Sequence, residues 1–139
     1  MTTIAIINQK GGTGKTTTAV NLAAGLAKAE FRTLLMDLDP QAHATYGLGV
    51  DLDELNGDVP TMAHVLSEER GKISDILVNT QEPNLKLAPS DIRLARAAAL
   101  LHGRNFREQV LQKALRAIKN NFDYVIIDCQ HHRLKVLPI

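Results

Sequence analysis

The sequence has few cysteines, few aromatic residues and almost no net charge, and each shortage argues against a class of protein. Its single cysteine, Cys129, excludes an internal disulfide and suits a reducing compartment. It has no tryptophan and only 4% aromatic residues, which argues against a base-stacking surface for nucleic acid. A net charge of +1 creates no global basic field that would by itself predict nucleic-acid binding.

Long hydrophobic runs are also missing. No apolar run approaches the length that spans a bilayer, and residues 1–9 lack the basic and apolar regions of a secretory signal. We therefore expect a cytoplasmic protein with no membrane partner. The 139 residues suffice for one domain with a buried core and are too few to expect two.

The sequence does contain an alternation of short apolar strands and helical patterns. It predicts strands over 3–8, 33–36, 85–89 and 124–127, and helices over 15–29, from 61 to 66 or 69, 90–102 and 105–118, with a further helical turn over 74–77. Residues 42–60 are rich in Gly, Asp and Pro and are interpreted as mostly loop with one short helix. This alternation predicts an α/β domain with a mainly parallel sheet flanked by helices.

Residue types at the predicted helix ends suggest how those helices are capped. Thr61 and Ser90 are the predicted N-caps of two helices. Gly103 is the expected stop of the second helix, and Asn105 with Glu108 is the expected capping pair of the last one.

The most informative stretch is KGGTGKT, from Lys10 to Thr16, which follows the first apolar run and precedes an alanine-rich helical pattern. Glycines let the backbone approach phosphates, and successive N–H groups form an anion nest that the helix N-terminus reinforces. Lys15 would reach the β- and γ-phosphates, and the Thr16 hydroxyl would coordinate Mg²⁺. The loop is a deviant form, because Gln9 replaces the usual first glycine and Lys10 adds a second lysine. The alternative is a glycine-rich turn that carries a lysine by chance.

Three acidic residues follow or end predicted strands. Asp37 and Asp39 are two residues apart on an extended segment, so their carboxylates point the same way. Asp128 ends the last apolar run, where an acid can hold Mg²⁺ beside Thr16. Asp128 alone would be interpreted as the start of a turn, and the alternative for Asp37 and Asp39 is a solvated turn.

Three motifs together resemble the ParA/MinD family of deviant Walker A ATPases, in its chromosome- and plasmid-partitioning branch. They are KGGTGKTT at 10–17, DLDPQ at 37–41 with GLG at 47–49, and FDYVIID at 122–128, and the match runs from residue 2 to Cys129. The resemblance implies a P-loop NTPase fold that binds ATP and Mg²⁺, and an ATP-hydrolysing partition protein that acts through nucleotide-dependent dimerisation. A reductase-type or cell-division relative is less favoured, because DLDPQ is typical of the partitioning branch.

The resemblance also implies roles for individual residues. Lys10 would reach the partner's phosphates across an ATP-sandwich dimer, Lys15 would act within its own subunit, and Asp39 would position the attacking water. The implied metal site consists of Thr16, Asp37 and Asp128. The implied nucleotide-binding residues are Gly11, Gly12, Thr13, Gly14, Lys15, Thr16 and Thr17, the last of which would contact the α-phosphate.

After Cys129 the sequence leaves the family pattern. Family chains continue with Asp-Cys-Pro-Pro and a substantial further segment, whereas this sequence continues QHHRLKVLPI over 130–139 and stops. We therefore expect residues 1–129 to be the N-terminal part of a ParA-type domain, residues 130–139 to be a tail outside the family, and the C-terminal part of the fold to be missing. Adjacent His131 and His132 on an extended tail point to opposite sides and are not expected to hold a metal. The other histidines, His43, His64 and His102, are expected to be ordinary surface or loop residues.

The family implies two kinds of protein partner, a second copy of the chain and a centromere-binding partition protein. Non-specific DNA binding and association with the nucleoid would depend largely on the missing half. The alternative to a partition ATPase is a truncated, catalytically impaired fragment that acts as an interaction or dimerisation module.

Overall fold

The computed structural model describes residues 1–8, 10–52, 59–67, 71–102 and 107–129. Its elements in chain order are β1 (Thr2–Ile6), α1 (Lys15–Lys28), β2 (Thr33–Leu38), α2 (His43–Gly47), α3 (Met62–Ser67), the 3₁₀ helix η1 (Ile73–Ile76), β3 (Val78–Asn79), β4 (Leu85–Ala88), α4 (Arg93–His102), α5 (Arg107–Ala117) and β5 (Tyr124–Cys129). The order of strands and helices follows the predicted alternation. The two-residue strand β3 was not predicted, because so short a segment carries no periodic pattern.

The strands form one sheet in the order β1-β5-β2-β4-β3. All its pairs are parallel except β3 with β4, which confirms the predicted α/β fold with a mainly parallel sheet. The central strand β2 is buried along its whole length, which explains why its sequence is almost continuously apolar.

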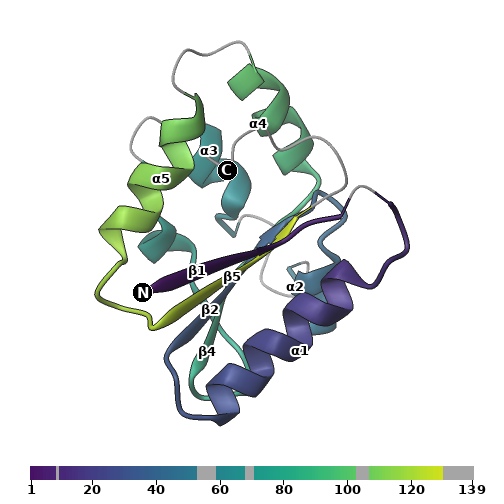
Figure 1. The fold of residues 1–139 in the computed structure, drawn as a ribbon. Helices are drawn as coiled ribbons and strands as arrows, with labels where there is room; N and C mark the ends of the chain where they lie inside the picture. Colours follow the sequence, from purple (N-terminus) through teal and green to yellow (C-terminus); the bar gives the residue numbers. More distant parts are fainter. Residues whose placement is uncertain (9, 53–58, 68–70, 103–106, 130–139) are drawn as a thin grey trace.

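Helices cover both faces of the sheet (Figure 1). Alternate residues of β2 serve the two sides: Leu34 and Met36 belong to the core under α3, α4 and α5, whereas Leu35 belongs to the core under α1. On α1 the fully buried positions are Ala19, Ala23 and Ala27. These small side chains let α1 pack close to the sheet. The position of α1 in turn fixes the loop that precedes it at the carboxyl end of β1.

The register of β2 and β5 places the acidic residues of the two strands side by side. Asp37 lies directly opposite Asp128 in the parallel pairing. At the other end of these strands, Arg32 Nη2 lies 2.8 Å from Asp123 Oδ1, and the Arg32 backbone N–H donates to Asp123 Oδ2 at 2.9 Å. The hydrogen bond from the Arg32 side chain lowers the pKa of Asp123 to about 2. This contact joins the segments that lead into both strands and supports the register.

Two predicted helix caps have different outcomes. Thr61 caps α3 as expected, because its Oγ1 accepts the Ala63 N–H at 3.3 Å. The Thr61 N–H also donates to His64 Nδ1 at 3.0 Å, so the half-buried His64 lies on α3 and takes part in the cap of that helix. Ser90 does not cap α4: that helix begins at Arg93, whose N–H donates to Asp91 Oδ1 at 2.7 Å.

Several other predictions concern residues that lie outside the described part of the chain. They are the helix stop at Gly103, the capping pair of Asn105 with Glu108, the side chain of His102, and the tail with His131 and His132. The exposed His43 begins α2, in agreement with the prediction of a surface position.

Helix α1 ends in a left-handed residue that is not glycine. Glu30 has φ 66°, its N–H donates to the Ala27 carbonyl at 2.9 Å, and the Phe31 N–H donates to the Leu26 carbonyl at 3.1 Å. These two hydrogen bonds define a Schellman motif, in which glycine is the favoured residue at the position of Glu30.

We expect Glu30→Gly to raise the free energy of unfolding by about 1 kcal/mol, because a left-handed L-residue costs roughly 1–2 kcal/mol and the greater freedom of glycine in the unfolded chain offsets part of that gain. Urea denaturation measures the change. Glu30→Ala keeps the unfavourable φ and is expected to leave stability nearly unchanged. An equal gain in both variants would instead point to the carboxylate as the destabilising group.

Candidate functional site

The glycine-rich loop lies at the carboxyl end of β1 and leads directly into α1. Gly12 has φ 69° and Gly14 has φ 78°, backbone conformations that residues other than glycine rarely adopt. Gly14 is the N-cap of α1; the cap makes no side-chain hydrogen bond, and the first turn of the helix contains no acidic residue. The N–H groups at this helix end are therefore available to an anionic ligand.

The two lysines of the loop have different surroundings. Lys15 is half-buried, and its Nζ lies 3.4 Å from the Lys10 carbonyl oxygen, so its side chain folds back over the loop. The Thr13 hydroxyl donates to the same carbonyl at 3.2 Å. Lys10 is exposed, and its backbone N–H donates to Asn8 Oδ1 at 3.0 Å. The loop thus turns one cation inward and leaves the other at the surface.

Asp128 lies near the carboxyl end of β5, opposite Ile6 of β1, and the glycine-rich loop follows β1. Its side chain is close enough to Thr16 for that residue to lower its pKa, yet its Oδ2 is buried and has no hydrogen-bond partner. Burial raises the pKa of Asp128, and the negative charge of Asp39 raises it further, whereas Thr16, Lys15 and His43 act in the opposite direction. A buried carboxylate oxygen without a partner is costly, which indicates that a ligand completes this site.

Asp37 is enclosed at the end of β2 and is wholly buried. Its Oδ2 accepts the Thr45 N–H at 2.9 Å and the Thr45 hydroxyl at 2.8 Å, and its Oδ1 accepts the Asp39 N–H at 3.0 Å. Burial raises the pKa of Asp37 to about 6 although these hydrogen bonds act against it. Asp37 therefore makes protein contacts with both of its carboxylate oxygens.

Asp39 lies in the turn after β2 and is half-buried. Its Oδ1 accepts the Gln41 N–H at 2.9 Å, and its carbonyl accepts the Ala42 N–H at 2.9 Å. Ala42 has φ 54°, an unusual value for a residue with a side chain, so the turn is held in a strained conformation.

The structure brings four of the predicted residues into one region, namely Lys15, Thr16, Asp39 and Asp128, whose charges and hydrogen bonds act on one another. Gly11, Thr13 and Thr17 are exposed on the loop and the first turn of α1, where a nucleotide would approach. Two contacts were missed at the sequence level: Thr45, which holds Asp37, and His43, whose charge acts on Asp128. Neither residue belongs to a recognised motif. Both lie in the segment 42–60, where the sequence has little periodicity that would predict their surroundings.

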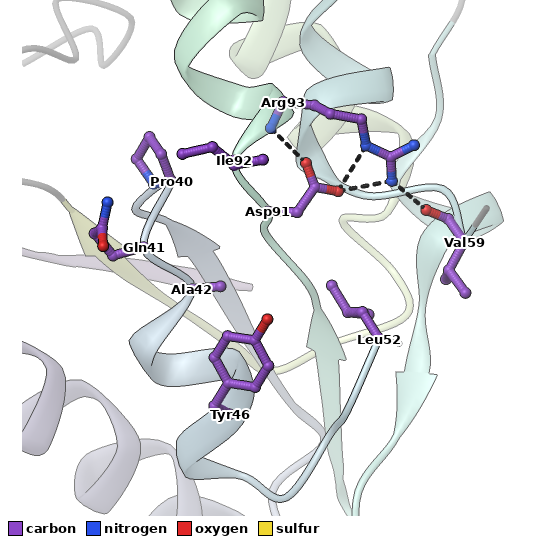
Figure 2. A pocket seen from close by; sticks show the side chains of 9 residues that line it. All are labelled: Pro40, Gln41, Ala42, Tyr46, Leu52, Val59, Asp91, Ile92 and Arg93. Carbon is purple, nitrogen blue, oxygen red and sulfur yellow. Dashed lines mark hydrogen bonds and ion pairs between the residues drawn. The ribbon is translucent and has the colours of Figure 1, made fainter. Parts of the chain in front are cut away.

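A hollow of about 420 Å³ lies at the same edge of the sheet, between the turn after β2 and the loop after β4 (Figure 2). It is lined by Pro40, Gln41, Ala42, Tyr46, Leu52, Val59, Asp91, Ile92 and Arg93. Figure 2 shows the Arg93 side chain held between the Asp91 carboxylate and the Val59 carbonyl, at 2.7 and 2.9 Å from Nη2. Burial acts to raise the pKa of Asp91, but hydrogen bonds from Arg93 and Thr61 outweigh it and lower that pKa overall. The charges of this hollow are therefore already satisfied within the protein.

Within the described ranges, no helix is both long enough and apolar enough to cross a membrane.

Comparison with known proteins relates this geometry to a family. The model of an AAA-domain family matches residues 1–137. The chromosome partitioning protein ParA of Myxococcus xanthus is 46% identical over 126 residues, which cover 91% of this chain and 43% of that protein. The chain spans about half the length, or less, of the curated relatives it matches.

Solved structures with the same fold include proteins bound to ATP or an ATP analogue. A cobyrinic acid a,c-diamide synthase from Mycobacterium smegmatis, solved with an ATP analogue and magnesium, superposes with a TM-score of 0.83 at 42% identity, covering 93% of this chain and 51% of that one. A Cyanothece McdA variant in complex with ATP superposes with a TM-score of 0.84 at 31% identity, covering 92% and 47%. The chain belongs to the AAA-domain family matched over residues 1–137, and within it to the ParA/MinD-type P-loop NTPases.

Proposed function

We propose that this chain binds ATP with Mg²⁺ and hydrolyses it as a partition ATPase of the ParA type. The observation that carries the proposal is the buried, unpartnered Oδ2 of Asp128, which lies beside Thr16 at the foot of the phosphate loop. The similarity to a chromosome partitioning protein, and to proteins solved with ATP or an ATP analogue, supports the same conclusion. As a partition ATPase, the chain would act in the cytoplasm with a centromere-binding protein. Non-specific DNA and the nucleoid are further partners that the family suggests.

The residues present fit a magnesium ion that is bound mainly through phosphates. Asp128 supplies one carboxylate and Thr16 one hydroxyl, and Mg²⁺ in nucleotide sites commonly uses only one or two carboxylates together with phosphate oxygens and waters. Among the described residues, no group of three or more His, Cys, Asp or Glu could hold a metal without the nucleotide. When bound, the ion would neutralise charge on the phosphates.

Each remaining residue has a role that its place in the structure supports. The N–H groups of the loop and of the first turn of α1 would bind the phosphates, and the inward-turned Lys15 would stabilise charge on the transferred group. Asp39 would orient the attacking water from the turn beside Asp128. The exposed Lys10 would reach the phosphates of a second copy, which makes nucleotide-dependent dimerisation part of the proposal.

Phosphate release by the purified chain tests this function. We expect turnover with Mg²⁺ and ATP that stops when EDTA removes the metal, and calorimetry is expected to detect ATP binding with Mg²⁺ present. A chain that binds ATP but shows no Mg²⁺-dependent turnover would contradict the hydrolytic part of the proposal. A chain that binds no nucleotide would contradict all of it.

A second candidate function, an interaction or dimerisation module, is favoured by one edge of the sheet. Within the described residues β1 pairs only with β5, and its other edge is open beside the exposed Ile7. Open edges of this kind invite pairing with another chain.

We expect size exclusion with light scattering to find a homodimer or a larger assembly. An assembly that forms only with ATP would support the nucleotide-dependent dimer, whereas one that forms without ATP would support the module. A monomer under both conditions would contradict both forms of association.

A further inference from the structure

The carboxylate of Asp37 is the centre of a small buried network. It accepts three hydrogen bonds, one from the Asp39 N–H and two from Thr45, and no part of its surface is exposed. Each of these bonds is 2.8 to 3.0 Å long, a normal distance for a strong hydrogen bond. A carboxylate used in this way has both of its oxygens engaged by the protein itself.

Thr45 extends the network to a third segment. The same hydroxyl that donates to Asp37 also accepts the Ser90 N–H at 3.1 Å, across 45 residues of sequence. Thr45 and Ser90 are both wholly buried. One hydroxyl group therefore ties α2 to the end of β2 and to the loop that follows β4. Buried hydrogen bonds that connect several segments in this way make those segments rigid.

The segment that this network holds in place is the one that carries Asp39. The Asp39 N–H is anchored to Asp37, and the residues that follow Asp39 return through a tight turn to Thr45 on α2. The backbone on both sides of Asp39 is therefore fixed by the same carboxylate. The side chain of Asp39 is in turn oriented by the Gln41 N–H, which donates to its Oδ1.

We infer that Asp37 and Thr45 are positioning residues that hold Asp39 for ATP hydrolysis, and that Asp37 is not a direct ligand of the metal. The inference rests on the proposed function, since Asp39 is the residue being positioned. It replaces the role near the metal that the sequence resemblance implies for Asp37. Orientation matters for catalysis, because a displacement of about 1 Å can lower a rate by roughly 10²-fold.

Two substitutions at Thr45 test the inference. Thr45→Val keeps the shape of the side chain but removes the hydroxyl, whereas Thr45→Ser keeps the hydroxyl. We expect Thr45→Val to lower kcat by at least about 10-fold while the Kd for Mg·ATP stays within about 2-fold, and Thr45→Ser to remain near the wild-type kcat. In the background of Asp39→Ala, Thr45→Val is expected to lower kcat no further, because both changes act through one group.

Hydrogen exchange gives a measurement that does not depend on activity. The Ser90 and Asp39 amides are expected to exchange slowly in the wild type and in Thr45→Ser, and at least about 10-fold faster in Thr45→Val. Wild-type kcat in Thr45→Val would overturn the inference. Equal losses of ATP affinity and kcat in both variants would also overturn it, because they would indicate a general structural role.

The test separates this inference from the proposed function. If the wild type turns over no ATP, the proposed function fails. The exchange rates then still decide the network: faster exchange only in Thr45→Val supports it, and unchanged exchange overturns it.

Discussion

Replacing Lys15 with alanine is expected to lower kcat/KM for ATP by at least about 10³-fold, which corresponds to roughly 4 kcal/mol of transition-state stabilisation. The Lys15 side chain folds over the phosphate loop, where its Nζ lies 3.4 Å from the Lys10 carbonyl oxygen. Its charge also acts on Asp128, so it faces the region where both phosphates and metal are proposed to bind. Charge that develops on a transferred phosphoryl group would lose one of its stabilising cations in this variant.

Lys28→Ala is the matched control for this experiment. Lys28 is an exposed lysine in the last turn of the same helix, at the end opposite the loop. We expect its replacement to leave kcat/KM within about 2-fold of the wild type, because the two ends of a 14-residue helix are about 20 Å apart. Steady-state phosphate release measures both variants. Equal activity of Lys15→Ala and the wild type would contradict the assignment of this loop to phosphate chemistry.

Asp39→Ala is expected to have the second largest effect, a fall in kcat of about 10²- to 10⁴-fold, as is typical when a group that moves or orients a proton is removed. ATP affinity is expected to be unchanged or somewhat higher, because the variant removes a negative charge from a region proposed to bind phosphates. Single-turnover hydrolysis separates the chemical step from binding, and calorimetry measures the Kd.

Asp39→Asn distinguishes the charge of Asp39 from its structural contact. The side-chain amide oxygen introduced by this substitution would still accept the Gln41 N–H that Asp39 Oδ1 accepts at 2.9 Å, so the turn is expected to persist while the charge is lost. We expect Asp39→Asn to be nearly as slow as Asp39→Ala. Asp75→Ala, which replaces an exposed acid on η1, is the control that should leave kcat unchanged. Full activity in Asp39→Asn would show that the turn, and not the carboxylate, is what hydrolysis needs.

The variants of Lys15 and Asp39 together would show whether a loss of activity arises in ATP binding or in the chemical step. Lys15→Ala is expected to affect both ATP affinity and turnover, whereas Asp39→Ala is expected to affect turnover alone. Thr45→Val is expected to resemble Asp39→Ala in kind but to be milder, since it displaces a group that remains present. This order of effects follows from how directly each side chain faces the proposed position of the phosphates.

Much of the fold was predictable because its signals are local. The apolar runs of β2 and β5 and the alanine-rich helical pattern of α1 are signals that depend only on neighbours along the chain. Boundaries were less predictable: α4 begins at Arg93, because Asp91 rather than Ser90 accepts the first N–H group. Both residues are good caps by type, and only the path of the chain after β4 decided between them.

The sequence by itself determined the glycine-rich loop, its two lysines and the acids at the ends of β2 and β5, because backbone conformation at glycine and strand periodicity are properties of short segments. Only the tertiary structure decided the surroundings of those acids. The sheet order β1-β5-β2-β4-β3 places Asp37 opposite Asp128, and packing then leaves Asp128 with an unpartnered oxygen while Asp37 is enclosed by Thr45. Burial and hydrogen bonding between segments far apart in the sequence, such as those of Thr45 and Ser90, leave no local pattern, so two similar aspartates acquire different surroundings only in the folded protein.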